Sequence, residues 1–342
     1  MKTYPKITAT TSTLSESDLE KFAIEKYGLN ETSRCKLFRT GINHTYMISD
    51  GAKKFVLRVY FKDWKTELEI SEEIRLLDLL NENGINVSHA VPDSDGNYIQ
   101  KLNAPEGLRH AVLFTFGEGD KIRFLNEETC FTIGSVMAKM HKVTSGESLE
   151  RLAFDEHSLL HSAYKTSTSI FSDALPEVKY LKQTISRISG SFASRKFLDC
   201  PSGIVHLDIW YDNMSIRNDR EITLFDFDNC GNGKLILDVA YFCKQLFHIE
   251  SDKEIYNQKV AAFLDAYRSQ RSLSDAELAF LPECGAAIFI YYLGMQASRF
   301  DWSNIFMSEN YLKMYIGRIR AWLDYHQDKV SNVNVLTRSK AE

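Results

Sequence analysis

The sequence lacks the features that mark several classes of protein. The longest apolar run among its 342 residues is the twelve-residue segment 284–295, which is too short to cross a bilayer and predicts a buried helix. The first residues carry no apolar core of a secretory signal. A net charge of -5 leaves no basic excess for nucleic acid or an anionic membrane surface. We therefore expect neither a nucleic acid nor a membrane as partner.

Cysteine and glycine motifs are missing as well. The six cysteines form no Cys-x-x-Cys pair and no zinc-ligand spacing, so we expect isolated reduced thiols in a cytoplasmic protein. No G-x-x-x-x-G-K-[ST] segment occurs, which argues against a P-loop enzyme. The chain also contains no internal repeat.

The remaining pattern changes character along the chain. A capping box at Ser17-x-x-Glu20 predicts a helix over 17–28, and a five-stranded sheet with a helix over 64–82 follows. A hairpin is expected at "PDSDGN". Beyond that, helical periodicity dominates, at 127–142, 175–188, 253–269, 276–299 and 308–326. We expect an α+β protein of two lobes, 1–117 and 118–328, with a loose polar tail over 329–342.

The strongest chemical signal is the spacing of three polar residues. "GIVHLD" predicts a strand that ends at Asp208, Asn213 stands five positions later, and "EITLFDF" brings Asp226 back on a hairpin. A carboxylate and an amide oxygen are ligands that suit Mg²⁺, which completes its shell with water and phosphate oxygens. The remaining carboxylate, Asp208, could accept a hydroxyl proton or orient that hydroxyl for attack on phosphorus.

The same segment has two other interpretations, a structural His–Asp pair and a phosphatase motif. A single His-x-Asp is usually a satisfied structural pair, and "LFDFDN" alone resembles the nucleophile motif of haloacid-dehalogenase-type phosphatases. Against the phosphatase, Cys230 stands where Thr or Val is needed, and the motif lies late in the chain. The joint spacing favours phosphoryl transfer.

The segments "HLDIWYDN" and "LFDFDN" together resemble the catalytic loop and metal strand of the aminoglycoside phosphotransferase family, which includes choline kinases and type II homoserine kinases. The family usually has Gly where this chain has Leu207. The resemblance implies a bilobal protein-kinase-like fold with ATP and Mg²⁺ as cofactors. It implies the following roles: Asp208 as catalytic base, Asn213 and Asp226 as metal ligands, Asp228 as an auxiliary acid, and His206 and Asp238 as residues that brace the loop.

The first lobe offers the nucleotide-binding half that this resemblance requires. "FVLRVY" presents Arg58 where protein kinases carry Lys, and its partner acid is expected on helix 64–82, at Glu73 or else at Glu72. By the same resemblance, Gly41 and Asn43 belong to the cover over the phosphates. The hinge near 113–117 would contact adenine through Thr115, Phe116 and Gly117.

The acceptor is the least determined part. By the resemblance it lies in the helical lobe, where Glu250, Arg299 and Asp301 are candidate contacts. No long activation loop follows Asp226, which favours a small-molecule hydroxyl acceptor such as an aminated antibiotic, an amino alcohol or a homoserine-like amino acid. A serine/threonine protein kinase of the bacterial stress-response type, and a nucleotide-binding module without transfer activity, remain as alternatives.

Overall fold

The computed structural model of the chain describes residue 5, residues 7–299 and residues 304–338. The chain divides into two compact units. The first comprises Met1–Glu118 together with Thr223–Asp228, and the second comprises Gly119–Ile222 together with Asn229–Glu342. The predicted boundary at Gly117 lies next to the first division, but the sequence did not indicate that Thr223–Asp228 belongs with the first unit.

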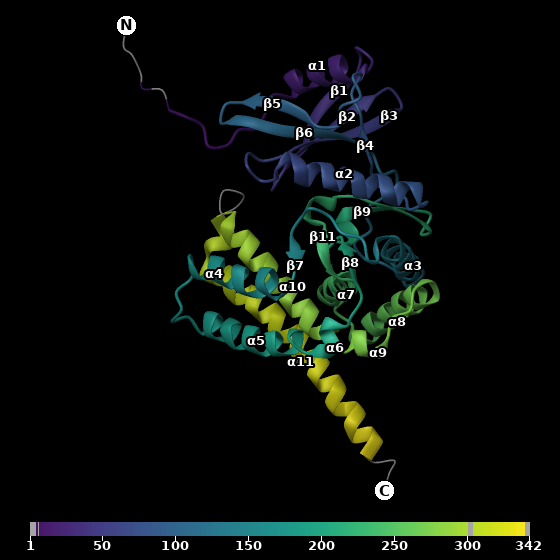
Figure 1. Ribbon diagram of the computed structural model, residues 1–342, viewed down its shortest axis with the longest axis vertical. Helices are drawn as coiled ribbons and strands as arrows, with labels where there is room; N and C mark the ends of the chain where they lie inside the picture. The colour runs from purple at the N-terminus through teal and green to yellow at the C-terminus, as the bar shows by residue number, and fades with distance from the viewer. Residues whose placement is uncertain (1–4, 6, 300–303, 339–342) are drawn as a thin grey trace. The chain divides into compact units, whose positions relative to one another are not determined.

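The first unit is built on an antiparallel sheet whose strands follow the order β1-β2-β3-β6-β4, with β5 also paired to β6 (Figure 1). Its strands are β1 (Arg34–Arg39), β2 (His44–Asp50), β3 (Lys53–Val59), β4 (Ala90–Val91), β5 (Gln100–Ala104) and β6 (Gly107–Thr115). The described residues thus give six strands, not the predicted five, because β4 is too short to leave a pattern. The expected hairpin at 92–97 is wrong, since β4 and β5 pair with different parts of β6.

Two helices accompany this sheet, α1 (Glu16–Tyr27) and α2 (Glu67–Glu82). The cap of α1 is Ser15, whose side chain accepts a hydrogen bond from the Asp18 backbone, so the helix begins before the predicted box. α2 begins with a capping box of Thr66 and Glu69. The core between α1 and the sheet contains these buried residues: Leu19, Ala23, Cys35, Tyr46, Ile48, Leu57, Val59, Ala111 and Leu113.

The second unit is mainly helical. Its helices are α3 (Glu127–Thr144), α4 (Ala163–Thr168), α5 (Pro176–Phe192), α6 (Arg195–Leu198), α7 (Ile236–Ile249), α8 (Lys253–Gln270), α9 (Asp275–Leu278), α10 (Leu281–Ser298) and α11 (Glu309–Arg338). Shorter turns are the π-helical η1 (His157–Ser162) and the 3₁₀ turns η2 (Tyr211–Asn213), η3 (Phe227–Asn229) and η4 (Asn304–Met307). Its strands form β7 (Ala153–Phe154), β11 (Gly231–Lys234) and β8 (Ser202–Val205) in that order, and a pair of β9 (Met214–Arg217) with β10 (Glu221–Leu224).

Helix α10 is the centre of this unit. It packs against α4, α5, α7 and α11, while α3 and α8 form a second closely packed pair. The apolar run 284–295 lies within α10 and is largely buried, as predicted. No described helix is both long and apolar enough to span a membrane.

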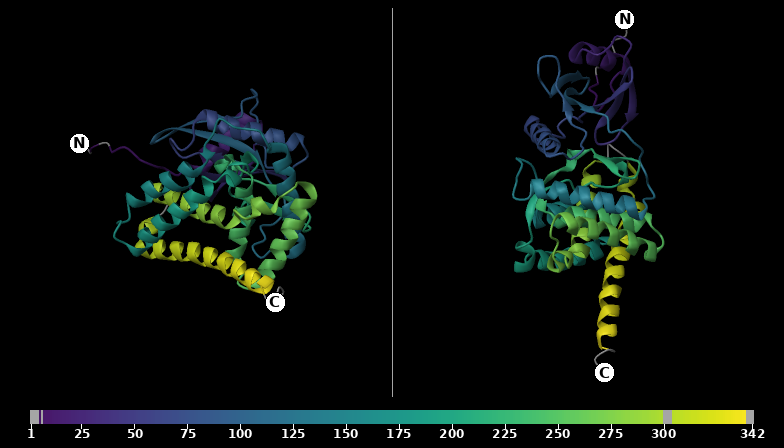
Figure 2. Two further views of the ribbon diagram at one scale, coloured as in Figure 1. Left: turned by 60° about the horizontal axis from the view of Figure 1, so that its bottom comes forward. Right: turned by 90° about the vertical axis from the view of Figure 1, so that its right-hand side faces the viewer.

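The C-terminal segment differs from its prediction. The tail expected to be loose from residue 329 continues α11 as helix to Arg338. Neither Gly nor Pro occurs after Gly317, so the segment contains no residue that would end a helix. The end of α11 extends beyond the other helices of its unit (Figure 2). The sheet-based first unit and the helical second unit together confirm the expected α+β class.

Candidate active site

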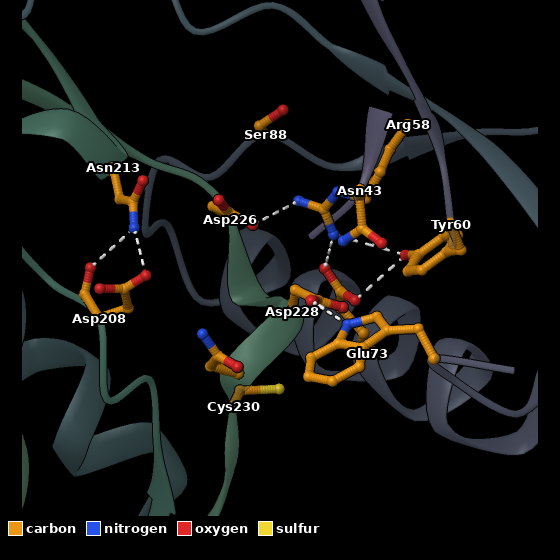
Figure 3. A network of polar contacts seen from close by, with 12 residues as sticks. Asn43, Arg58, Tyr60, Glu73, Ser88, Asp208, Asn213, Asp226, Asp228 and Cys230 are labelled. Atoms are coloured by element: carbon orange, nitrogen blue, oxygen red, sulfur yellow. Dashed lines mark hydrogen bonds and ion pairs between the residues drawn. The ribbon is translucent and has the colours of Figure 1, made fainter. Parts of the chain in front are cut away.

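In the second unit, Asp208 lies just beyond β8 with both carboxylate oxygens engaged. The Asn213 side-chain amide donates to Asp208 Oδ2 at 2.7 Å and to the Asp208 backbone carbonyl at 3.1 Å (Figure 3). The Tyr241 hydroxyl donates to Asp208 Oδ1. Burial and the charge of Asp208 raise the pKa of Tyr241 well above its usual value, so this hydroxyl keeps its proton as a donor. The carboxylate is therefore held in one orientation.

The loop that carries Asp208 is anchored by Asp238 on α7. Asp238 is fully buried and accepts hydrogen bonds from the backbone amides of His206 at 2.8 Å and Leu207 at 2.6 Å. His141 on α3 contacts the same carboxylate, with 3.0 Å between Nε2 and Oδ2. This is the loop contact that the resemblance implied for Asp238. His206 also takes part, through its backbone amide.

Leu207 occupies the position where the family usually has Gly, and its backbone explains that usage. Its φ of 61° lies in the left-handed region, which is unfavourable for a residue with a branched side chain. The conformation is held by the amide bond to Asp238 and by the Tyr292 hydroxyl, which donates to the Leu207 carbonyl at 3.0 Å. Leu207 thus has a backbone conformation that Gly adopts without strain.

In the first unit, Arg58 on β3 joins two carboxylates. Arg58 Nη1 lies 2.7 Å from Glu73 Oε1, and Nη2 lies 3.0 Å from Asp226 Oδ1 (Figure 3). Tyr60 donates to the other oxygen of Glu73 at 3.3 Å. Burial opposes the charge on Arg58, but Glu73, Tyr60 and Asp226 outweigh it and raise the arginine pKa well above its usual value. Glu73 is therefore the partner acid, whereas Glu72 pairs with Arg75.

Asp226 and Asp228 belong to the first unit, because the end of β10 is hydrogen-bonded to it. The Leu224 amide donates to the Asn86 carbonyl at 3.0 Å, and the Leu224 carbonyl accepts from the Ser88 amide at 2.9 Å. Asp226 has a φ of 65°, and the Trp64 indole donates to Asp228 Oδ2 at 2.8 Å. The predicted auxiliary acid thus has a tryptophan partner that no sequence motif indicated.

The predicted cover and hinge residues lie around the same sheet. Gly41 lies in the turn between β1 and β2, and Asn43 Oδ1 accepts from the Phe61 amide at 3.3 Å. The Thr115 carbonyl accepts from the Ser88 hydroxyl, and the Phe116 ring lies 5.2 Å from Lys54 Nζ. Gly117 follows as the chain leaves the sheet. Their contacts with a nucleotide remain predictions.

The structure describes two of the three acceptor candidates, and their surroundings differ. The Glu250 carboxylate makes an ion pair of 2.6 Å with Lys259, so its charge is already balanced. Arg299 is buried at the end of α10. Asp301 lies outside the described residues. Their acceptor roles remain predictions.

Several residues of this site escaped the sequence analysis. Tyr241 and His141 lie on helices and fit an ordinary helical pattern, so nothing in their spacing marked them. Tyr292 lies in the segment 284–295, which was expected only to form a buried helix, although its hydroxyl donates to the Leu207 carbonyl next to Asp208. The available signal was Asp238, because Tyr241 follows it three residues later on α7.

The oxygen donors suit a hard divalent cation such as Mg²⁺. The Asn213 amide nitrogen is committed to Asp208, which fixes the amide orientation and leaves its carbonyl oxygen as a metal ligand. Asp226 gives one oxygen to Arg58, and its side chain is 44% exposed, so the second oxygen is accessible. Each unit thus contributes one oxygen of a kind that binds Mg²⁺, the amide oxygen of Asn213 in the second unit and a carboxylate oxygen of Asp226 in the first.

Together, the sheet with a buried Arg–Glu pair and the helical unit with an anchored Asp–Asn loop define a kinase-like phosphotransferase. The chain belongs to the phosphotransferase enzyme family, whose model matches residues 35–273. It is accordingly an enzyme of the kinase type, which transfers a phosphoryl group. This confirms the family and the class of reaction expected from the sequence.

Relatives and solved structures agree with that assignment. A homoserine kinase of Bradyrhizobium diazoefficiens is 26% identical over 285 residues, covering 82% of this chain and 84% of its own length. An amicoumacin kinase solved with AMP-PNP, Ca²⁺ and Ami has a TM-score of 0.74 at 20% identity, covering 91% of this chain and 94% of that one. A microcompartment-associated aminopropanol kinase has a TM-score of 0.73 at 21% identity, covering 92% of this chain and 98% of that one. At this identity the two structures show the fold alone.

Proposed function

We propose that this protein is an ATP- and Mg²⁺-dependent kinase that transfers the γ-phosphoryl group to a hydroxyl of a small molecule. The names of its relatives indicate the range of acceptors: an amino acid with a hydroxyl, an amino alcohol, or an aminated antibiotic. In the reaction, the acceptor oxygen forms a bond to the γ-phosphorus while the bond to the β-phosphate oxygen breaks. ADP leaves with that electron pair, and the hydroxyl proton passes to Asp208.

The observation that carries the proposal is that hydrogen bonds hold the Asp208 carboxylate in one orientation. Two donors, Asn213 and Tyr241, hold the carboxylate, and the loop beneath it is fixed by Asp238. A carboxylate held in this way can align an acceptor hydroxyl and take its proton as the new bond forms.

Other residues of the chain would bind the nucleotide. Asn213 and Asp226 are the proposed magnesium ligands, and bound Mg²⁺ would neutralise phosphate charge that develops in the transition state. Arg58, oriented by Glu73, presents a fixed positive charge to the phosphates. Gly41, Asn43 and the backbone of Thr115, Phe116 and Gly117 are the proposed contacts with the rest of ATP.

A small acceptor is favoured over a protein segment by the chain that follows Asp228. Between η3 and α7 there is one short strand, β11, and no room for a long activation loop. Protein kinases control substrate access with such a loop. A freely diffusing acceptor needs none.

The test is an ADP-release assay with ATP and Mg²⁺ across hydroxyl amino acids, amino alcohols, choline and aminated antibiotics. We expect one class to stimulate release, with one phosphorylated product formed per ADP. Asp208→Asn should lower kcat by about 1000-fold while nucleotide binding is retained. Asp212→Asn is the matched control, because Asp212 lies in the same loop but pairs with Lys121.

Two results would overturn the proposal. Turnover by Asp208→Asn at the wild-type rate would remove the role of this carboxylate. Phosphorylation of a protein substrate without turnover of any small molecule would favour the protein-kinase alternative.

A further inference from the structure

Lys244 lies on the same face of α7 as the residues that hold the catalytic loop. Asp238, Tyr241 and Lys244 follow one another at intervals of three residues, so their side chains are neighbours on the helix. Asp238 anchors the loop backbone, and Tyr241 donates to the Asp208 carboxylate. The Lys244 ammonium lies 4.1 Å from the centre of the Tyr241 ring. The lysine and the proposed catalytic base thus contact the same tyrosine, the lysine at the ring and Asp208 at the hydroxyl.

The surroundings of Lys244 are aromatic. Its side chain is buried, with 3% of the residue exposed, and its ammonium lies 4.5 Å from the Phe289 ring centre and 5.9 Å from that of Tyr292. The structure shows no hydrogen bond or ion pair from this ammonium to any described residue. Cation–π contacts offset only part of the cost of burying a charge.

That cost is visible in the proton affinity of the lysine. Burial lowers the pKa of Lys244 to about 7, although the negative charge of Asp208 raises it, and Arg318 adds to the lowering. A buried cation without a protein partner reduces the stability of the fold. Ionisable groups whose pKa is strongly shifted by burial are common at functional sites, where a ligand can supply the missing partner.

A second polar atom in the same neighbourhood also lacks a partner. His248 lies one turn further along α7, its ring is 5.2 Å from that of Phe289, and its Nε2 is buried without a hydrogen-bond partner among the described residues. Burial lowers the pKa of His248 to about 3, with contributions from Arg318, Lys244 and Lys253. The histidine is therefore neutral at physiological pH and adds no second charge beside the lysine.

Resting on the proposed function, we infer that the acceptor is a hydroxy acid or hydroxy amino acid whose carboxylate binds the Lys244 ammonium while its hydroxyl faces Asp208. The carboxylate supplies the missing counter-charge, and a bound anion restores the proton that burial disfavours. An acceptor whose only charge is an ammonium would be repelled by Lys244. Lys244 thus determines specificity between hydroxy amino acids and amino alcohols.

The test uses acceptor pairs that differ only by a carboxylate. These pairs are L-homoserine with 3-aminopropan-1-ol, L-threonine with 1-aminopropan-2-ol, and L-serine with ethanolamine. We expect the wild-type enzyme to have a kcat/KM at least about 100-fold higher for the carboxylate member of the preferred pair. Lys244→Met should remove most of this preference by raising KM for that member.

A matched control is available in the same unit. Lys253 also lies over an aromatic ring, with Nζ 3.8 Å from the Phe247 ring centre, but its ammonium donates to the carbonyls of Phe247 and Glu250, both at 2.7 Å. Lys253→Met should therefore keep the wild-type preference. A preference lost equally in both variants would show a general effect of removing a lysine and would overturn the inference.

Binding separates failure of the inference from failure of the proposed function. Dissociation constants for each pair are measured by calorimetry with Mg²⁺ and AMP-PNP present. If amino alcohols are phosphorylated and carboxylates are not, the kinase stands and the inference falls. If nothing is phosphorylated but a carboxylate binds to wild type and not to Lys244→Met, the anion site stands without the reaction. Absence of carboxylate binding to the wild-type protein overturns the inference in every case.

Discussion

Arg58 in the first unit and Lys244 in the second are both buried cations beside residues of the proposed active site, and their surroundings are opposite. Arg58 has carboxylate partners at 2.7 Å and 3.0 Å, and its pKa is raised. Lys244 has aromatic neighbours and no ion pair to a described residue, and its pKa is lowered. The first cation has its counter-charges within the protein, whereas the second receives one from the acceptor carboxylate in the inferred complex.

The presence or absence of a paired carboxylate suits a buried cation to one of two roles. A paired cation has a fixed position and can present a constant charge to every substrate molecule, which suits binding of a common nucleotide. An unpaired cation gains an ion pair only from an acceptor that carries a negative charge, which suits discrimination between anionic and other acceptors. Substitutions at the two positions should therefore have opposite effects on stability.

The largest effect on stability is expected when the partner of Arg58 is removed. Glu73→Gln leaves a buried guanidinium without its closest carboxylate, so we expect a loss of about 3 kcal/mol in the free energy of unfolding. Urea denaturation measures this loss. Glu72→Gln on the same helix breaks the more exposed pair with Arg75 and should cost under about 1 kcal/mol. Similar losses in the two variants would show that burial of the Arg58 pair is unimportant.

A gain in stability is expected for the second cation. Lys244→Met replaces a buried unpaired ammonium by an apolar side chain of similar length, so we expect an increase of about 2 kcal/mol in the free energy of unfolding. The control, Lys253→Met, loses two hydrogen bonds to carbonyl groups and should lose about 1 kcal/mol. A destabilised Lys244→Met protein would contradict the assignment of this lysine as an unsatisfied charge.

The gain from Lys244→Met should depend on pH with a defined sign. The pKa of Lys244 is about 7 in the folded protein, against about 10.4 in the unfolded chain. Between these values the unfolded chain binds a proton that the folded protein lacks, so wild-type stability rises with pH relative to the variant. The advantage of the variant should be greatest below pH 7 and should shrink through pH 8 to 10. Denaturation of both proteins at several pH values tests this, and a constant difference would contradict it.

The smallest effect concerns the backbone at Leu207. Leu207→Ala and Leu207→Gly both remove a fully buried side chain, but only Gly also relieves the left-handed backbone. We expect Leu207→Gly to be more stable than Leu207→Ala by about 1 kcal/mol, the reverse of the usual order within regular structure. Urea denaturation of the pair measures this difference. An alanine variant as stable as the glycine variant would show that the backbone relaxes.

These contrasts also show what could be predicted from the sequence. The fold class and most helices were expected from hydrophobic periodicity. The family was expected from the resemblance of "HLDIWYDN" and "LFDFDN" to its catalytic loop and metal strand. Glu73 was the first choice for the acid that pairs with Arg58 because it matches the helix register of that family, and its carboxylate lies 2.7 Å from Arg58.

Features that depend on contacts between distant segments were missed. In the sequence, Lys244 is one polar residue of an expected helix. Its contact with the Phe289 ring arises because α7 packs against α10, which the local sequence does not show. The hairpin at 92–97 was wrong because β6 is long enough to pair with both flanking strands. Residues from 329 onward were expected to form a loose tail because they are polar. They continue α11 as helix to Arg338, and the segment has no Gly or Pro to end it.

The three-residue spacing on α7 has a consequence for how such enzymes diversify. Asp238 and Tyr241 hold the loop and the carboxylate of the proposed catalytic base, while Lys244, one turn further along, meets the acceptor in the inferred complex. A change at position 244 alone would alter which molecule is phosphorylated and leave the reacting groups in place. One helix therefore lets selection act on substrate choice and on catalytic power as separate traits.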